Sequence, residues 1–174
     1  KLIARNGYNG TVLWSRDLPD GYQVHRSAFI ATRDTFYMIN GDHALLLDPA
    51  TGRELGRVRL PGVPGFWKWM VLRDNVLFVL TGKREPGTRA MKGDRTFGGW
   101  SWGDLSAGYY GKDVPYGFGH TLAAYDLKEK QLLWKHREET LIDSRAMSLQ
   151  GEKMFLFCPD KLVRCLSTTQ GEVI

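Results

Sequence analysis

An eleven-residue pattern that recurs along the chain constrains its fold more than any other feature. The clearest copies span residues 4–14 and 124–134, and both place Ala first, Asn or Asp third and Trp last. Looser copies span residues 46–56, where Gly replaces the final Trp, and begin at Cys165. The chain ends at Ile174, one position before the fourth copy would reach its aromatic residue. We therefore expect the chain to be a piece of a longer protein.

The spacing of these copies indicates a repeat. The seventh position of each copy, a predicted turn, falls at Gly10, Gly52, Lys130 and Gly171. The separations are 42, 78 and 41 residues, so the middle one equals one period plus 36 residues. A period in the forties is typical of architectures in which each unit hides its apolar face by stacking on its neighbours. The sequence therefore predicts stacked units with one insertion.

Each unit reads as a set of short strands separated by turn signals, such as the Asn-Gly-Asp hairpin signal at residues 40–42. Four strands per 42 residues predict an all-β fold, namely a β-propeller fragment of about three four-stranded blades. Because an incomplete propeller leaves open sheet edges, we expect further blades, from the parent chain or from another chain. The predicted strands lie at residues 27–31, 35–39, 44–47, 54–60, 67–72, 77–81, 122–125, 131–135, 144–149, 153–158 and 163–166.

The recurring pattern has a physical interpretation as a fastener between blades. Asp48 and Asp126 are placed to accept hydrogen bonds from nearby backbone N–H groups, and Gly52 tolerates the positive φ of a tight reversal. Trp14 and Trp134 then fall on outer strands, where an indole packs flat against the next blade and donates its N–H to a backbone carbonyl. We interpret these five as docking residues rather than as ligand contacts.

This pattern, Ala-x-Asp-x-x-x-Gly-x-x-x-Trp, resembles the tryptophan-docking motif of pyrroloquinoline quinone (PQQ)-like repeat propellers over nearly the whole chain apart from the insertion. The resemblance implies a bacterial, periplasmic or otherwise extracytoplasmic protein. That superfamily includes quinoprotein alcohol dehydrogenases, a lipoprotein that scaffolds outer-membrane protein assembly, and bacterial proteins without known chemistry. In the enzymes, adjacent cysteines abut the quinone, and Asp, Glu and Asn serve as base and calcium ligands. This chain has no adjacent cysteines, and no such triad can be placed by motif.

Composition narrows the classes of partner. The net charge is +5, and Lys and Arg are scattered among acidic residues, which argues against a nucleic-acid surface. The longest apolar runs fall far short of the roughly 20 residues that span a bilayer. Cys158 and Cys165 lack companions at metal-ligand or haem-attachment spacing, and no other metal motif is present. We expect two free, half-buried thiols, with a disulfide between them as the alternative.

Basic side chains fall at matching positions of the predicted innermost strands. Counted from the preceding turn, His25, Trp67 and Arg145 share one offset, and Arg26 and Lys68 share the next. Cationic groups that converge on one channel suit an anionic ligand such as a carboxylate. The alternative is a wet channel whose bases pair with acids of other blades. The candidate ligand-binding residues on these strands are His25, Arg26, Lys68, Trp69 and Arg145.

The insertion, at residues 83–119, is rich in Gly and aromatic residues. Loops of this length without their own secondary structure are usually functional or disordered, and so many aromatics argue against disorder. Trp100, Trp102, Tyr109 and Tyr110 are candidates to cap the channel, to stack on a flat ligand or sugar, or to bind a partner chain. The alternative is a self-packed plug that covers a blade edge.

We therefore expect a non-catalytic binding or scaffolding propeller that recognises a protein or a small anionic ligand through the insertion. One alternative, implied by the resemblance, is an oxidoreductase in which Arg26, Lys68 and Arg145 hold PQQ, with calcium, and Asp143 acts as the base. Asp143 has a second interpretation as an ion-pair partner of the neighbouring bases. A further alternative is a carbohydrate-binding or sensor module, because aromatic loops serve all three classes.

Overall fold

The computed structural model describes residues 1–18, 28–84 and 117–174. These ranges form thirteen β-strands in four antiparallel sheets, together with one 3-10 turn at Ser144–Ala146, and they contain no α-helix. The all-β prediction is confirmed. These ranges contain no helix with the length and hydropathy needed to cross a membrane.

Consecutive strands pair with one another, so each sheet is a meander in chain order. The four sheets are the edge hairpin (β1–β2), the first blade (β3–β6), the insertion blade (β7–β10) and the last blade (β11–β13). Their strands are β1 (Leu2–Arg5), β2 (Val12–Arg16), β3 (Phe29–Ala31), β4 (Phe36–Asn40), β5 (His43–Leu47), β6 (Glu54–Val58), β7 (Phe66–Arg73), β8 (Val76–Gly82), β9 (Phe118–Asp126), β10 (Gln131–Asp143), β11 (Ser148–Gln150), β12 (Lys153–Cys158) and β13 (Leu162–Ser167).

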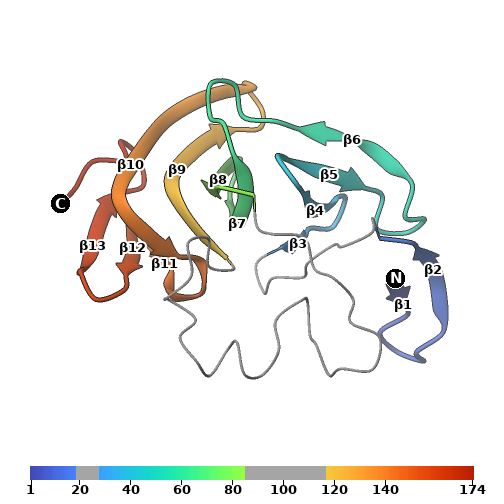
Figure 1. The fold of residues 1–174 in the computed structure, drawn as a ribbon. Helices are drawn as coiled ribbons and strands as arrows, with labels where there is room; N and C mark the ends of the chain where they lie inside the picture. The colour runs from blue at the N-terminus through green and yellow to red at the C-terminus, as the bar shows by residue number, and fades with distance from the viewer. Residues whose placement is uncertain (19–27, 85–116) are drawn as a thin grey trace.

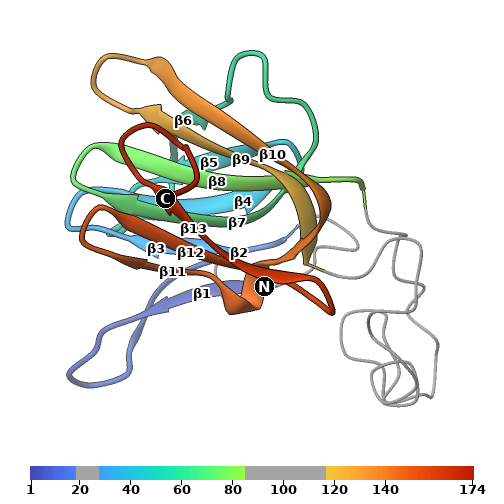
Figure 2. The same cartoon turned by 90° about the vertical axis from the view of Figure 1, so that its left-hand side faces the viewer.

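The sheets fan out side by side around a common centre, as Figure 1 shows. In the two four-stranded blades the first strand lies nearest this centre, and the fourth, β6 or β10, lies at the rim. Seen edge-on in Figure 2, the turns that join β7 to β8 and β9 to β10 lie on one side of the fan. The connection from β8 to β9 leaves on the opposite side. That side is called the insertion face below.

Apolar side chains fill the space between neighbouring sheets. One cluster lies between the first and insertion blades and includes Tyr37, Ala44 and Trp67. A second lies between the insertion and last blades and includes Phe78 and Leu156. Because the central strands are covered on both faces, segments such as residues 77–80 read as continuous apolar runs rather than as alternating ones.

Two predicted boundaries were wrong. The outer strand β10 continues to Asp143, because Ile142 and Asp143 pair with Gly119 and Phe118 of β9. Residues 144–146 then form a 3-10 turn, so the inner strand predicted at 144–149 is confined to β11. The same pairing places Phe118 and Gly119 in β9, and the insertion therefore ends at Gly117.

Candidate functional site

The four copies of the sequence pattern fold into four similar turns. In the second copy, Asp48 Oδ1 accepts hydrogen bonds from the backbone N–H groups of Ala50 (2.8 Å) and Thr51 (3.1 Å). In the third copy, Asp126 Oδ1 accepts bonds from the two equivalent N–H groups, at 2.8 and 2.9 Å. A short polar side chain at the third position thus satisfies backbone donors that the reversal leaves unpaired.

The indoles of Trp14 and Trp134 each reach the turn of the next sheet. Trp14 Nε1 donates to the Pro49 carbonyl oxygen at 2.8 Å, and Trp134 Nε1 donates to that of Thr168 at 2.9 Å. In both cases the acceptor is the fourth residue of the pattern. Each contact crosses from one sheet to the next, which is the geometry of a fastener between blades.

Each indole lies flat on the Gly at the seventh position of the receiving turn. A Cβ on Gly52 would lie 2.6 Å from Cε3 of Trp14, and one on Gly171 would lie 2.5 Å from Cε3 of Trp134. Contacts that short do not occur, so the ring requires Gly beneath it. Both glycines have positive φ, 71° and 72°, which adds a second reason for Gly at these positions.

The contact between the first and insertion blades lacks both the docking Trp and the Gly that would receive it. Gly56 stands where the second copy would carry its Trp, so this pair of blades lacks the indole. The turn that would receive it carries Lys130, a non-glycine residue with φ of 54°. The Trp and its receiving Gly are thus present together in two copies and absent together in one.

Candidate channel residues of the insertion blade lie near the end that carries the insertion. Lys68 is fully buried in β7, where the pairing register shifts between Trp67 and Trp69, and its Cε lies 3.3 Å from the place of a Cβ on Gly82. Trp69 is buried in the apolar cluster shared with the last blade, so its ring belongs to the core rather than to a channel surface. Trp67 is buried in the other cluster.

Asp143 and Arg145 form an ion pair at the same end of the blade. Arg145 Nε donates to Asp143 Oδ1 at 2.8 Å, and its backbone N–H donates to the same oxygen at 3.0 Å. Asp143 is buried, whereas the Arg145 side chain is 43% exposed. The Arg145 guanidinium also lies over the Phe118 ring, 5.6 Å from its centroid. Of the two interpretations of Asp143, this geometry favours the ion-pair partner over the base.

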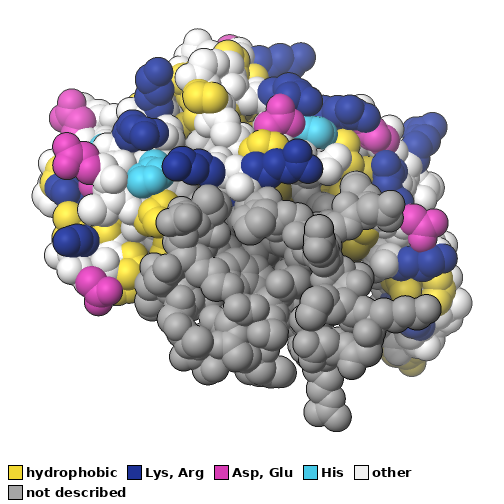
Figure 3. Space-filling model, viewed as in Figure 1, with side chains coloured by type: hydrophobic (Ala, Val, Ile, Leu, Met, Phe, Trp, Pro, Cys, Tyr) yellow, Lys and Arg dark blue, Asp and Glu magenta, His cyan; other side chains and the backbone are white. Residues whose placement is uncertain are grey.

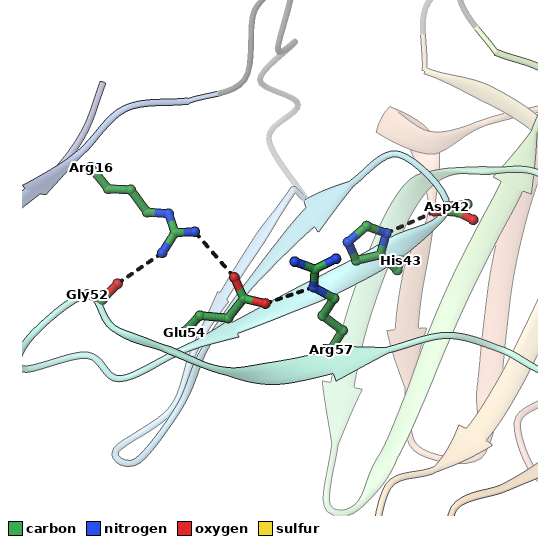
Figure 4. Close-up of polar contacts among 6 residues, drawn as sticks. All are labelled: Arg16, Asp42, His43, Gly52, Glu54 and Arg57. Carbon is green, nitrogen blue, oxygen red and sulfur yellow. Dashed lines mark hydrogen bonds and ion pairs between the residues drawn. The ribbon is translucent and has the colours of Figure 1, made fainter.

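A second charged network joins the edge hairpin to the first blade, as Figure 4 shows. Glu54 accepts hydrogen bonds from Arg57 (2.8 Å) and from Arg16 (3.4 Å), and their bonds and charges hold the pKa of Glu54 below its usual range. The hydrogen bond from His43, followed by the Arg59 charge, likewise lowers the pKa of Asp42. These acids are therefore already neutralised by neighbours.

A buried polar row on β10 was not predicted from the sequence. The Glu138 carboxylate lies between His136 Nε2 (2.8 Å) and Arg164 Nε (2.7 Å), at the contact with the last blade. Cys158 of β12 is buried and hydrogen-bonds Thr140 of β10, and burial raises the pKa of that thiol. Both Cys158 and Cys165 are free, but only Cys165 is half-buried as expected, whereas Cys158 is fully buried. The missed signal was alternation at residues 135–139, where exposed residues flank the half-buried His136 and the buried Glu138.

The remaining candidates lie outside the described residues, so their roles remain predictions. They are His25, Arg26, Trp100, Trp102, Tyr109 and Tyr110. In the described part of the chain, no group of three or more His, Cys, Asp or Glu side chains is arranged to hold a metal ion.

Comparison with known proteins gives the fold. No family model and no curated protein sequence matches the chain. Among solved structures, BamB from Moraxella catarrhalis matches 94% of this chain with 12% identity and a TM-score of 0.53. The computationally designed protein Ika8 matches 96% with 13% identity and a TM-score of 0.55. The chain has the fold of a β-propeller fragment. It spans 42% and 40% of the lengths of these two proteins.

Proposed function

We propose that this chain belongs to a PQQ-like repeat propeller that binds or scaffolds a partner protein, without catalysis, through its insertion face. The docking turns support the PQQ-like assignment, because two of the four copies pair a Trp with its receiving Gly. A periplasmic or other extracytoplasmic location follows from the same assignment.

The observation that carries the binding role is the accumulation of basic side chains on the insertion face. Figure 3 shows Lys and Arg side chains strung along the blades beside the grey region. At this end of the blades, Arg59, Lys83, Arg84 and Arg145 are all exposed. Three of the acids near this end are held by bases, Asp42 by Arg59 and His43, Glu138 by His136 and Arg164, and Asp143 by Arg145.

A positive surface around an aromatic loop fits a partner that offers acidic and apolar groups together. Arg and aromatic residues are enriched at protein interfaces, since both contribute large contact areas and Arg also makes charge-assisted hydrogen bonds. The Arg145 side chain, which pairs with Asp143, is 43% exposed on this face. We infer that the partner is a protein with an acidic surface.

The test replaces residues 84–116 with a four-residue turn. The strands it must join are already adjacent, because a Cβ on Gly82 would lie 2.8 Å from Cα of Gly119. We expect the variant to unfold at nearly the same temperature and to lose the partners that the unaltered chain retains from a native extract, measured by quantitative mass spectrometry. A double charge reversal at Lys128 and Lys153 on the opposite face is the matched control. Retention unchanged by the replacement would refute the proposal, and loss of the fold would show that the insertion is a structural plug.

A further inference from the structure

Gly56, in the middle of β6, is a glycine that neither the backbone nor the packing requires. Its φ is not positive, unlike those of Gly52 and Gly171. Apart from its chain neighbours, no atom lies within 4 Å of the place of a Cβ, so a side chain here would meet open space. Glycine inside a strand weakens the strand, and it often marks a place where a ligand or another chain comes close to the backbone.

The side chains around the space over Gly56 are apolar and partly buried. Leu46 pairs with Gly56 across the sheet, and Val58 lies two residues further along the same strand. Leu127 and Leu132 belong to the turn and the outer strand of the insertion blade, where the repeat places the receiver of a side chain from position 56. All four leucine and valine side chains pack against the apolar cluster between the two blades. The space over Gly56 therefore lies at the outer margin of that cluster.

Two half-exposed leucines adjoin this margin. Leu55 precedes Gly56 and Leu133 follows Leu132, and each lies at a register shift in the pairing of its blade. They are 48% and 41% exposed. Both outer strands thus present apolar surface next to the space over Gly56.

Two exposed lysines of the insertion blade lie beside the same space. Lys130 stands in the turn at the position that holds Gly in the occupied turns. Lys135 pairs with Ala123, which belongs to the cluster shared with the first blade, so Lys135 lies on the side of β10 that faces that blade. Glu129, the acid of this turn, pairs with Lys128 at 3.7 Å. The lysines therefore favour a ligand that carries negative charge.

The occupied sites of the same chain show what such a space holds. Trp14 and Trp134 leave their outer strands at the position of Gly56 in the second copy, and each extends over the next turn. At the third turn, a ring that enters from outside meets the Lys130 ammonium rather than a glycine. An ammonium is attracted both to the face of an aromatic ring and to a carboxylate.

We propose that the space over Gly56, between the rim strands β6 and β10, binds an aromatic side chain of a partner protein that has a carboxylate beside the ring (Figure 1). The ring takes the place that Trp14 and Trp134 fill in their own sites and packs against Leu132, while the carboxylate pairs with Lys130. This site lies at the rim rather than on the insertion face, so it does not rest on the function proposed above.

The test titrates N-acetyl-tryptophan, which has an indole beside a carboxylate, into the isotope-labelled chain and follows backbone amide signals by NMR. We expect saturable shifts at Gly56 and Lys130, with half-saturation in the millimolar range, and unmoved signals at Gly52 and Gly171, whose sites are filled. N-acetyl-tryptophanamide lacks the carboxylate and should bind about two- to fivefold more weakly, as expected for the loss of an exposed ion pair. N-acetyl-leucine lacks the ring and should give no saturable shift at Gly56.

Two variants fill the site from within the chain. Gly56→Leu places a side chain in the open space, and Gly56→Trp combined with Lys130→Gly recreates a docked indole. Both should abolish the shift while the other amide signals keep their positions. Lys130→Gln should weaken N-acetyl-tryptophan to the affinity of the amide, whereas Lys128→Gln, the matched control in the same turn, should leave the affinity unchanged.

Four results would overturn the proposal. They are the absence of a saturable shift at Gly56, an equal affinity for either comparison compound, a shift that survives both Gly56 variants, and equal effects of Lys130→Gln and Lys128→Gln. If the Gly56 signal instead moves with protein concentration in the absence of any probe, the occupant is a second copy of this chain, and the assignment to a partner protein is wrong.

Discussion

Substitution of Gly171 by Ala tests the fastener against a matched position in the same chain. Gly171 and Gly10 have φ of 72° and 73°, but only Gly171 lies under an indole. Any cost that arises from the backbone is therefore shared by the two substitutions. The difference between them measures the contact of the glycine with Trp134.

The magnitudes follow from what each methyl group meets. A non-glycine residue at positive φ costs roughly 1–2 kcal/mol, and this is the whole cost expected for Gly10→Ala. At Gly171 the methyl group would lie 2.5 Å from the ring, so Trp134 must move and lose its 2.9 Å hydrogen bond to Thr168. A lost hydrogen bond costs about 1 kcal/mol, and disturbed packing of a large buried side chain costs about 1–3 kcal/mol more. We expect Gly171→Ala to lower the free energy of unfolding by about 3–6 kcal/mol.

These terms can be measured by urea unfolding of four variants. They are Gly10→Ala, Gly171→Ala, Trp134→Ala and the double variant Gly171→Ala/Trp134→Ala. Once the indole is absent, Gly171→Ala should cost only the backbone term, so the double-mutant cycle should give a coupling of about 2–4 kcal/mol. Equal losses at Gly10 and Gly171, or a coupling near zero, would refute the argument that Gly is required by the ring above it.

Three further predictions follow from individual contacts. Gly56→Trp combined with Lys130→Gly should stabilise the chain more than the sum of the two single changes in urea unfolding, because only the pair recreates an indole on a glycine; additive effects would contradict this. The pKa of Asp42 is lower in the folded state, so its contribution to stability is present above its unfolded pKa and is lost as pH falls through its folded pKa; acid titrations of stability should therefore show a smaller loss for Asp42→Asn. Burial raises the pKa of the Cys158 thiol, so it should react with a thiol reagent more slowly than Cys165 at neutral pH, and equal rates would show that the last blade opens freely.

Local signals in the sequence were sufficient for most of the fold. The strand at residues 153–158 was predicted at its observed bounds, because turn residues flank it on both sides. The Asn-Gly-Asp signal gave the β4–β5 hairpin, in which Asn40 pairs with His43 across a two-residue turn. In each case the determining residues are within a few positions of one another.

Contacts that depend on a neighbouring sheet were not predictable in the same way. The extension of β10 to Asp143 depends on its pairing with Phe118, and the insertion separates that residue from β8 in sequence. The buried Glu138 carboxylate is paired with His136 and with Arg164 of the last blade. The spacing of residues within β10 does not predict the contact with Arg164. Sequence offsets also aligned Arg145 with inner-strand residues, but it lies in a 3-10 turn that precedes β11.

The two interfaces of the insertion blade are held by different means. Toward the last blade, Trp134 docks on its turn, and Arg73 donates to the Gly151 carbonyl oxygen and to Thr168 Oγ1 (2.9 Å). Toward the first blade the indole is missing, and the contact consists of the apolar cluster around Trp67 together with the bond from Trp67 N to the Gly41 carbonyl oxygen (2.8 Å). Apolar packing is not directional, whereas a docked indole with its hydrogen bond fixes one orientation.

We therefore expect the insertion blade to move together with the last blade and to separate first from the first blade. Native-state hydrogen exchange measures this, since amides of β3 and β4 should exchange through an opening of lower free energy than amides of β12. Recreating the fastener with Gly56→Trp and Lys130→Gly should slow exchange in β3 and β4 while leaving that in β12 unchanged. Uniform protection across both interfaces in the unaltered chain would show that the apolar cluster alone holds the blades as firmly as the docked indole does.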